Sequence, residues 1–210
     1  MLRLRARLLL PLLAAVLAAP AAVAGDASPW SMGHHSKVRL LAGGLAADGT
    51  HRAALEIVLD AGWKTYWRHP GDSGIPPRLE ASGSSNLESI EILWPAPARF
   101  EDAGGIAYGY VDAVTFPVRI RPKNPAKPIG LSVALDFGVC KDICIPARAE
   151  MTATSPAAPT RHARAIDKAA ASVPRPAALG AGGALGVVSV AGLQADARTF
   201  AVEARLPPDA

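Results

Sequence analysis

Short stretches in which apolar and polar residues alternate recur along the middle of this chain. The clearest is 129–137 (Ile-Gly-Leu-Ser-Val-Ala-Leu-Asp-Phe), and 36–41 repeats the pattern. A period of two residues is typical of a strand that buries one face. Looser or more aromatic runs predict further strands at 51–59, 63–67, 89–94, 108–120 and 148–154. Short strands at this spacing predict an all-β protein, folded as an antiparallel β-sandwich over residues 28–155.

Glycine and proline separate the predicted strands. The chain contains 19 Gly and 19 Pro, and Gly43-Gly44 and Asp48-Gly49 are turn signals. Segment 69–77 (His-Pro-Gly-Asp-Ser-Gly-Ile-Pro-Pro) is expected to be a long loop. After the amino terminus, no stretch approaches the roughly 20 apolar residues of a transmembrane helix. We therefore expect no membrane span in this part of the chain.

The pattern changes near the end of the sandwich. Residues 156–183 are predicted to be a linker with a short helix at 160–171, for which Thr160 is a suitable N-cap. Strand patterns return at 185–190 and 199–205. Two strands rarely fold alone. Residues 184–210 are therefore expected either to add to the sandwich or to begin an incomplete second domain.

The amino terminus has the pattern of a secretion signal. Arg3, Arg5 and Arg7 precede an apolar run, and Ala22-Val23-Ala24 is a small-x-small cleavage site. We predict a bacterial signal peptide at 1–24, cleavage after Ala24 and export to the periplasm. Cleavage removes three of the four excess positive charges. The basic composition therefore gives no reason to expect nucleic-acid binding.

Cys140 and Cys144 are the only cysteines. Disulfides persist in an oxidising compartment such as the periplasm. An extended i to i+4 segment would separate the Cα atoms by about 13 Å, whereas a disulfide needs about 4.4–6.8 Å. If the pair is oxidised, residues 141–143 must fold back as a turn or one helical coil. So small a ring would stabilise the fold by only about 2 kcal/mol. The spacing therefore favours thiol chemistry but leaves a structural disulfide and a metal site open.

Several segments in order resemble the amino-terminal periplasmic domain of the disulfide-interchange protein DsbD, especially its ScsB-like relatives. The resemblance covers residues 30–154 and is carried by the segments 62–77, 94–100, 108–110, 116–118 and 140–146. It implies an immunoglobulin-like β-sandwich whose Cys140–Cys144 pair works without a bound cofactor. The implied electron donor is a membrane-embedded DsbD-like domain. The implied clients are periplasmic thioredoxin-like or disulfide-isomerase proteins, with cytochrome c biogenesis and copper tolerance as associated processes.

The resemblance also implies roles for individual residues. Cys144 matches the cysteine expected to form the mixed disulfide with a client. Glu101 and Asp102 match an acidic pair on a cap loop, where they would help to protonate a leaving thiolate. The alternative is that both are solvated loop charges.

Three aromatic residues are candidates for flanking the site. Tyr66 and Trp67 resemble the family's flanking aromatics, although core packing is an equally good interpretation. The aromatic residue of the cap loop is missing, because Ala103-Gly104 stands in its place. Ile106 or Tyr108 is expected to substitute for it.

Two other functions use the same cysteines. In a copper-tolerance module, thiolates would bind Cu(I), with His34 and His35 as further candidate ligands. A Cys-x-x-x-Cys site of this kind occurs in Sco proteins, but their thioredoxin fold disagrees with the all-β pattern. In a non-catalytic adaptor, the disulfide would only stiffen a loop.

Overall fold

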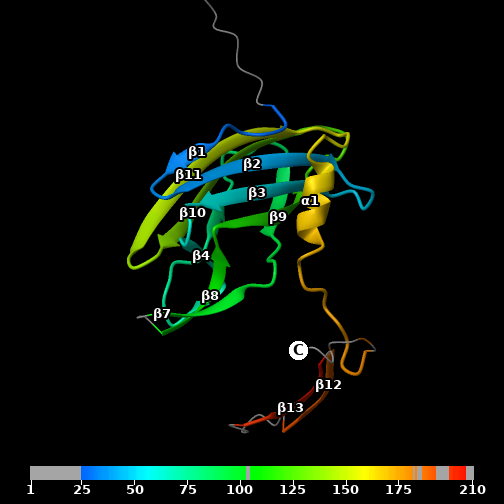
Figure 1. Ribbon diagram of the computed structural model, residues 1–210. Helices are drawn as coiled ribbons and strands as arrows, with labels where there is room; N and C mark the ends of the chain where they lie inside the picture. Colours follow the sequence, from blue (N-terminus) through cyan, green and yellow to red (C-terminus); the bar gives the residue numbers. More distant parts are fainter. Residues whose placement is uncertain (1–24, 103–104, 182, 184–185, 193–198, 207–210) are drawn as a thin grey trace, which may run out of the picture.

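Two antiparallel sheets pack face to face in the computed structural model, which describes residues 25–102, 105–181, 183, 186–192 and 199–206 (Figure 1). The first sheet has the order β1-β2-β3-β9-β6. Its strands are β1 (Ser31–Gly33), β2 (Ser36–Leu45), β3 (His51–Leu59), β9 (Ala113–Pro122) and β6 (Leu87–Ile92). The second has the order β11-β10-β4-β8-β7, with β5 also paired to β10. Its strands are β11 (Cys144–Ser155), β10 (Ile129–Cys140), β4 (Lys64–Gly71), β8 (Gly105–Val111), β7 (Ala98–Asp102) and β5 (Arg78–Glu80).

The core lies between the two sheets. Alternate residues of β10, such as Leu131, Leu135 and Phe137, are at most 2% exposed and face the first sheet. Phe116 of β9 packs there too, with edge-to-face rings of Trp94 and Tyr110 around it. Burial of apolar area is the dominant favourable contribution to such a fold. The immunoglobulin-like sandwich expected from the sequence is therefore confirmed.

Two strand predictions were wrong in extent. The run 108–120 is not one strand: Asp112, with a φ of 61°, separates β8 in one sheet from β9 in the other. A residue with a left-handed backbone conformation changes the direction of the chain sharply. The alternation of apolar and polar residues cannot reveal such a corner. The predicted strand at 63–67 was too short, because β4 continues to Gly71. The first residues of the predicted loop at 69–77 therefore belong to this strand.

One short helix, α1 (Ala163–Ala170), follows the sandwich and packs Ile166 against Leu41 and Ala54. Its N-cap is His162, not Thr160 as predicted. The hydroxyl of Thr160 instead accepts a hydrogen bond from the backbone N–H of His162 at 3.1 Å. The same hydroxyl donates a hydrogen bond to the carbonyl of Ala42 at 2.6 Å. The threonine therefore fixes the turn before the helix to β2.

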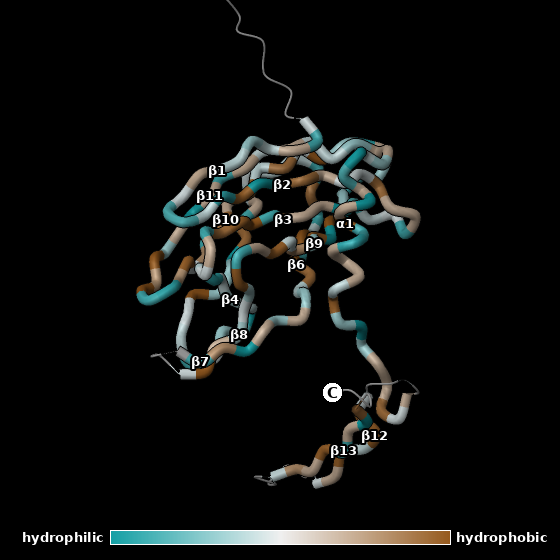
Figure 2. Tube along the Cα trace, in the orientation of Figure 1, coloured by the Kyte–Doolittle hydropathy of each residue, from teal (hydrophilic) through white to brown (hydrophobic). Residues whose placement is uncertain are grey.

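The predicted strands near the end are present as the hairpin of β12 (Gly186–Ala191) and β13 (Ala201–Arg205). Figures 1 and 2 show this hairpin away from the sandwich. Exposed apolar side chains lie on β13 and directly before it. Phe200 is 66% exposed and Val202 is 49% exposed. In the described part of the chain, no helix is long and apolar enough to cross a membrane.

Candidate functional site

Cys140 and Cys144 close the tip of the β10–β11 hairpin. They are the last residue of β10 and the first of β11, are paired in register, and form a disulfide. Their Cα atoms lie 4.2 Å apart. The intervening residues 141–143 form a turn, in which the N–H of Lys141 donates to the carbonyl of Ile143 at 3.1 Å. The fold-back that an oxidised pair requires is therefore supplied by a β-hairpin.

The two cysteines differ in exposure. Cys140 is 1% exposed and packs with Tyr66 and Ala107, whereas Cys144 is exposed at the surface. A thiolate must approach the sulfur that it attacks, so access helps to decide which sulfur reacts. An incoming thiol can reach Cys144 and not Cys140. Attack at Cys144 would leave the Cys140 sulfur as the leaving group.

The side chain of Tyr66 contacts the exposed sulfur. It is 1% exposed, and its hydroxyl lies 3.3 Å from the Sγ of Cys144. A phenol can donate a hydrogen bond to a thiolate as well as accept one from a thiol. Tyr66 can therefore stabilise the charge that forms on Cys144 when the pair is reduced.

The loop after β4 forms one wall of the site. Gly74 lies against the ring of Tyr66 with a φ of 108°, so a side chain there would be strained and would overlap the ring. The N–H of Gly138 donates to the carbonyl of Ile75 at 3.1 Å, which fixes the loop to β10. A Cβ at Gly138 would lie 2.9 Å from the Cβ of Ile75. Both glycines thus allow the loop to lie directly over the site.

Phe100 of β7 also borders the site. It is partly buried against the cluster of Tyr66, Ala107 and Cys140. Lys64 is the register partner of Cys140 across β4 and β10, and its Nζ lies 5.4 Å from the centroid of the Phe100 ring. A cation placed this way is attracted by the ring face. Positive charge and an aromatic ring therefore adjoin the buried cysteine.

Comparison with known proteins agrees with this geometry. A family model described as "Thiol:disulfide interchange protein DsbD, N-terminal" matches residues 37–156, more than half of the 210 residues. The chain belongs to this family. Membership and the disulfide together identify a thiol–disulfide exchange module.

The DsbD-type sandwich is similar to the solved N-terminal periplasmic domain of ScsB from Proteus mirabilis. The two are 26% identical, with a TM-score of 0.63 over 79% of this chain. The match spans 64% of the ScsB chain, less than two thirds of its length. A yeast GGA1 GAE domain–P21 structure matches at 7% identity and a TM-score of 0.31 over 61% of this chain and 98% of that one, and this likeness carries no argument. A comparison with curated proteins found no match.

The acidic pair expected from the resemblance, Glu101 and Asp102, falls on β7. Glu101 is exposed and its carboxylate pairs with Arg99 at 2.7 Å. Strand alternation turns Glu101 to the face opposite Phe100. The backbone of Asp102 pairs with Gly105, but its side chain lies outside the described atoms, as do residues 103–104. Proton transfer by this pair stays a prediction.

Of the aromatic residues predicted to flank the site, Tyr66 lies at the disulfide and Trp67 lies in the core. Trp67 follows Tyr66 on β4 and so points to the other face, where it packs against the core. Its indole Nε1 is buried without a hydrogen-bond partner among the described residues. Tyr108 and Ile106 alternate with Ala107 on β8, whereas Ala107 faces Cys140. Of these candidates, the structure brings Tyr66 to the disulfide.

The predicted copper ligands His34 and His35 lie in the turn between β1 and β2. His35 stacks on Trp63 with ring centroids 3.9 Å apart, and its Nδ1 lies 2.8 Å from a carboxylate oxygen of Asp60. His34 is exposed in the turn between β1 and β2. Across the described residues, no group of three or more His, Cys, Asp or Glu is placed to hold a metal ion. The copper-binding alternative has not been tested.

Sequence reasoning gave no role to Phe100, Gly74 or Lys64. Phe100 stands directly before the acidic pair in the sequence. Its place at the site depends on the pairing of β7 with β8, which puts Phe100 opposite Ala107. Gly74 carried a weak signal, since a glycine inside a predicted loop often marks a positive φ. Nothing local indicated that Lys64 would pair with Cys140.

Proposed function

We propose that this protein carries electrons in the periplasm. Reducing equivalents pass through Cys140 and Cys144 from a membrane-embedded DsbD-like donor domain to thioredoxin-like or disulfide-isomerase clients. The observation that carries the proposal is the unequal exposure of the two sulfurs in a family of thiol:disulfide interchange domains. The predicted signal peptide and the periplasmic ScsB relative support the location.

In the first half of the cycle the protein is reduced. A donor thiolate attacks the Cys144 sulfur, and the Cys140–Cys144 bond breaks as a mixed disulfide forms. Cys140 leaves as a thiolate and takes up a proton. The second donor thiol loses its proton and attacks the donor sulfur of the mixed disulfide. This step releases Cys144 as a thiolate beside the hydroxyl of Tyr66.

In the second half the protein reduces its client. The Cys144 thiolate attacks a client disulfide, and one client sulfur leaves as a thiolate. Cys140 then loses its proton and attacks Cys144, which restores the hairpin disulfide and releases the second client thiol. Two electrons pass to the client, and the pairing of Cys140 with Cys144 in register keeps the resolving thiol close.

Two serine variants test the proposal. Both Cys140→Ser and Cys144→Ser should abolish electron transfer to a thioredoxin-fold protein disulfide while leaving the circular dichroism spectrum unchanged. With glutathione disulfide as the probe, Cys140→Ser should form a stable mixed disulfide, detected by mass. Cys144→Ser should react at least about tenfold more slowly, because its remaining thiol is buried.

The opposite pattern would contradict the proposal. If both variants kept full transfer activity, the pair would not be the electron carrier. If Cys144→Ser formed the mixed disulfide faster than Cys140→Ser, the assignment of the attacking cysteine would be wrong. Thermal unfolding of both variants, compared with the reduced natural protein, controls for loss of fold.

A further inference from the structure

The residues that follow β4 leave one strand and join another beside the disulfide. Directly after β4, the N–H of Asp72 donates to the carbonyl of Ile106 on β8 at 2.8 Å. Three residues later, the carbonyl of Ile75 accepts the N–H of Gly138 on β10 at 3.1 Å. Residues 72–75 therefore connect β8 to β10, and we call them the crossing segment.

The side chain of Asp72 makes a second bond to β8. The N–H of Ile106 donates to a carboxylate oxygen of Asp72 at 3.0 Å. In a regular antiparallel ladder, two hydrogen-bonded residues exchange both of their backbone bonds. Here the carboxylate takes the place of the backbone carbonyl, so the chain can turn toward β10 without losing this bond. A Cβ at Gly105 would lie 2.7 Å from the same carboxylate, so the start of β8 packs closely around it.

The middle of the crossing segment lies against Tyr66. Gly74 adjoins the ring so closely that an added Cβ would lie 2.3 Å from a ring carbon. The ring is 1% exposed, and its hydroxyl lies 3.3 Å from the Sγ of Cys144. The position of the crossing segment therefore limits where this hydroxyl can lie.

The β8 end of the crossing segment adjoins the cover of Cys140. Ile106 is followed by Ala107, which packs in one cluster with Cys140. Phe100 of β7 is the register partner of Ala107 and packs against the same cluster. A bond from Asp72 to β8 therefore limits how far β7 and β8 can move away from the buried cysteine.

We propose that Asp72 is a positioning residue for thiol–disulfide exchange. Its carboxylate fastens the crossing segment to β8, which keeps Cys140 covered and holds the hydroxyl of Tyr66 at the sulfur of Cys144. This role rests on the exchange function proposed above. It assigns the unequal reactivity of the two sulfurs to a residue that acts through its neighbours.

Alkylation of Cys140 tests the cover. In the variant Cys144→Ser the one remaining thiol is that of Cys140, and iodoacetamide reaches a buried thiol when the site opens locally. Adding Asp72→Ala removes one hydrogen bond and should speed this alkylation about two- to tenfold. Asp72→Asn keeps an acceptor oxygen and should react like the natural residue. An alanine variant that reacts no faster than the asparagine variant would overturn the proposal.

The pH profile of Cys144 tests the connection to Tyr66. In the variant Cys140→Ser, Asp72→Ala should slow alkylation about two- to tenfold below the thiol pKa, because a displaced hydroxyl no longer stabilises the thiolate. The rates should converge above the thiol pKa, where the thiol is fully ionised. Added to Tyr66→Phe, Asp72→Ala should cause no further loss, since the hydroxyl is already absent. Additive losses would overturn the proposed path through Tyr66.

The signs of the two effects separate positioning from a general loss of stability. A loosened fold would speed the alkylation of both cysteines, whereas the proposal requires a faster reaction at Cys140 and a slower one at Cys144. If circular dichroism shows that Asp72→Ala does not fold, Asp72→Glu takes its place. It keeps the charge but moves the carboxylate by one methylene group, and it should change both rates in the same directions. Faster alkylation of both cysteines in a folded variant would overturn the proposal.

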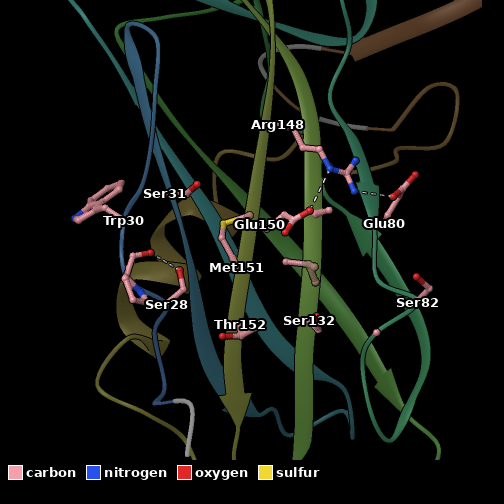
Figure 3. A pocket seen from close by; sticks show the side chains of 14 residues that line it. Ser28, Trp30, Ser31, Glu80, Ser82, Ser132, Arg148, Glu150, Met151 and Thr152 are labelled. Carbon is pink, nitrogen blue, oxygen red and sulfur yellow. Dashed lines mark hydrogen bonds and ion pairs between the residues drawn. The ribbon is translucent and has the colours of Figure 1, made fainter. Parts of the chain in front are cut away.

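Two other carboxylates provide matched controls. Asp48, in the turn between β2 and β3, accepts the N–H of Thr50 at 3.0 Å, so Asp48→Ala also removes a bond to a backbone N–H. Glu150 lines a groove of about 570 Å³ over β10 and β11 (Figure 3), where it pairs with Arg148 at 3.4 Å. Neither variant should change an alkylation rate. If Glu150→Ala had the same effects as Asp72→Ala, loss of negative charge would explain them and the proposal would be wrong.

Electron transfer to a thioredoxin-fold protein disulfide tests the exchange function separately. Absence of transfer by the natural protein would contradict that function, and alkylation of the single-cysteine variants would still measure the effect of Asp72 on each thiol. Normal transfer together with alkylation rates that Asp72→Ala leaves unchanged would contradict the role of Asp72 alone.

Discussion

The two ends of the β10–β11 hairpin have opposite properties. At the tip, Cys144 is exposed and Ile143 of the turn is 66% exposed. At the base, Ile129 and Ser155 are opposed in register, and each is 0% exposed. The Nδ1 of His51 on β3 lies 2.8 Å from the Oγ of Ser155, so this contact ties the hairpin to the other sheet. One hairpin thus combines an anchored base with an accessible tip.

This difference shows how a redox site can be exposed without weakening the fold. Packed side chains between the sheets supply stability at the base, whereas the tip has Tyr66 and Phe100 as its cover. Changes at the base should therefore alter the free energy of unfolding and leave thiol exchange unchanged. Changes at the tip should alter thiol exchange, whatever their effect on the free energy of unfolding.

The largest stability effect is expected at the base. Leu131→Ala removes a side chain that is 2% exposed, and such changes cost about 2–5 kcal/mol in the free energy of unfolding. The rate of reduction by dithiothreitol should stay unchanged. Chemical denaturation measures the first quantity and thiol trapping the second. A large change in the reduction rate would show that base and tip are coupled.

Gly74→Ala should affect the tip next most strongly. The left-handed backbone at Gly74 and the adjacent ring of Tyr66 leave no room for a methyl group. We expect backbone strain to lower the free energy of unfolding by about 1–3 kcal/mol. We also expect faster alkylation of the reduced thiols, because Tyr66 is displaced. Gly49→Ala is a matched control, because Gly49 has a φ of 78° and nothing within 4 Å of its added Cβ. Equal alkylation rates in the two variants would contradict the role of the loop wall.

The sequence predicted the sandwich well because its strands bury one face. The alternation at 129–137 located β10, although the strand continues to Cys140. The site was harder to predict, since it forms where β4, β7, β8 and the hairpin tip meet. Phe100 reaches Cys140 through strand pairing, and the corner at Asp112 depends on a single backbone angle. Neither the pairing nor the angle leaves a periodic signal in the sequence.

The base should also show a pH dependence. Burial lowers the pKa of His51 from 6.5, so the folded protein keeps this ring neutral, while the unfolded chain binds a proton more readily. The stability that results is present above about pH 6.5 and is lost as pH falls through the folded-state pKa. Chemical denaturation at pH 7.5 and at pH 5 measures the free energy of unfolding. This free energy should fall less between the two pH values for His51→Gln than for the natural protein. An identical decline in both would exclude His51 as the cause.

The smallest effect is expected for Tyr66→Phe, which removes only the hydroxyl near Cys144. Loss of one hydrogen bond should lower the reactivity of Cys144 toward glutathione disulfide about two- to tenfold. Tyr110→Phe is a control, because the Tyr110 hydroxyl donates to the carbonyl of Pro95 at 2.8 Å. Stopped-flow kinetics at several pH values separates a raised thiol pKa from a general loss of rate. An unchanged pH profile in Tyr66→Phe would contradict its role in stabilising the thiolate.

The equilibrium reduction potential of Cys140–Cys144 tests the central claim most directly. It can be measured by mass-shift thiol trapping of the protein, without its predicted signal peptide, in graded redox buffers. An electron carrier should give a value within the range of exchange catalysts, roughly −120 to −270 mV. A value below about −300 mV is typical of structural disulfides. That result would contradict the electron-carrier proposal and favour an adaptor whose disulfide only stiffens the hairpin.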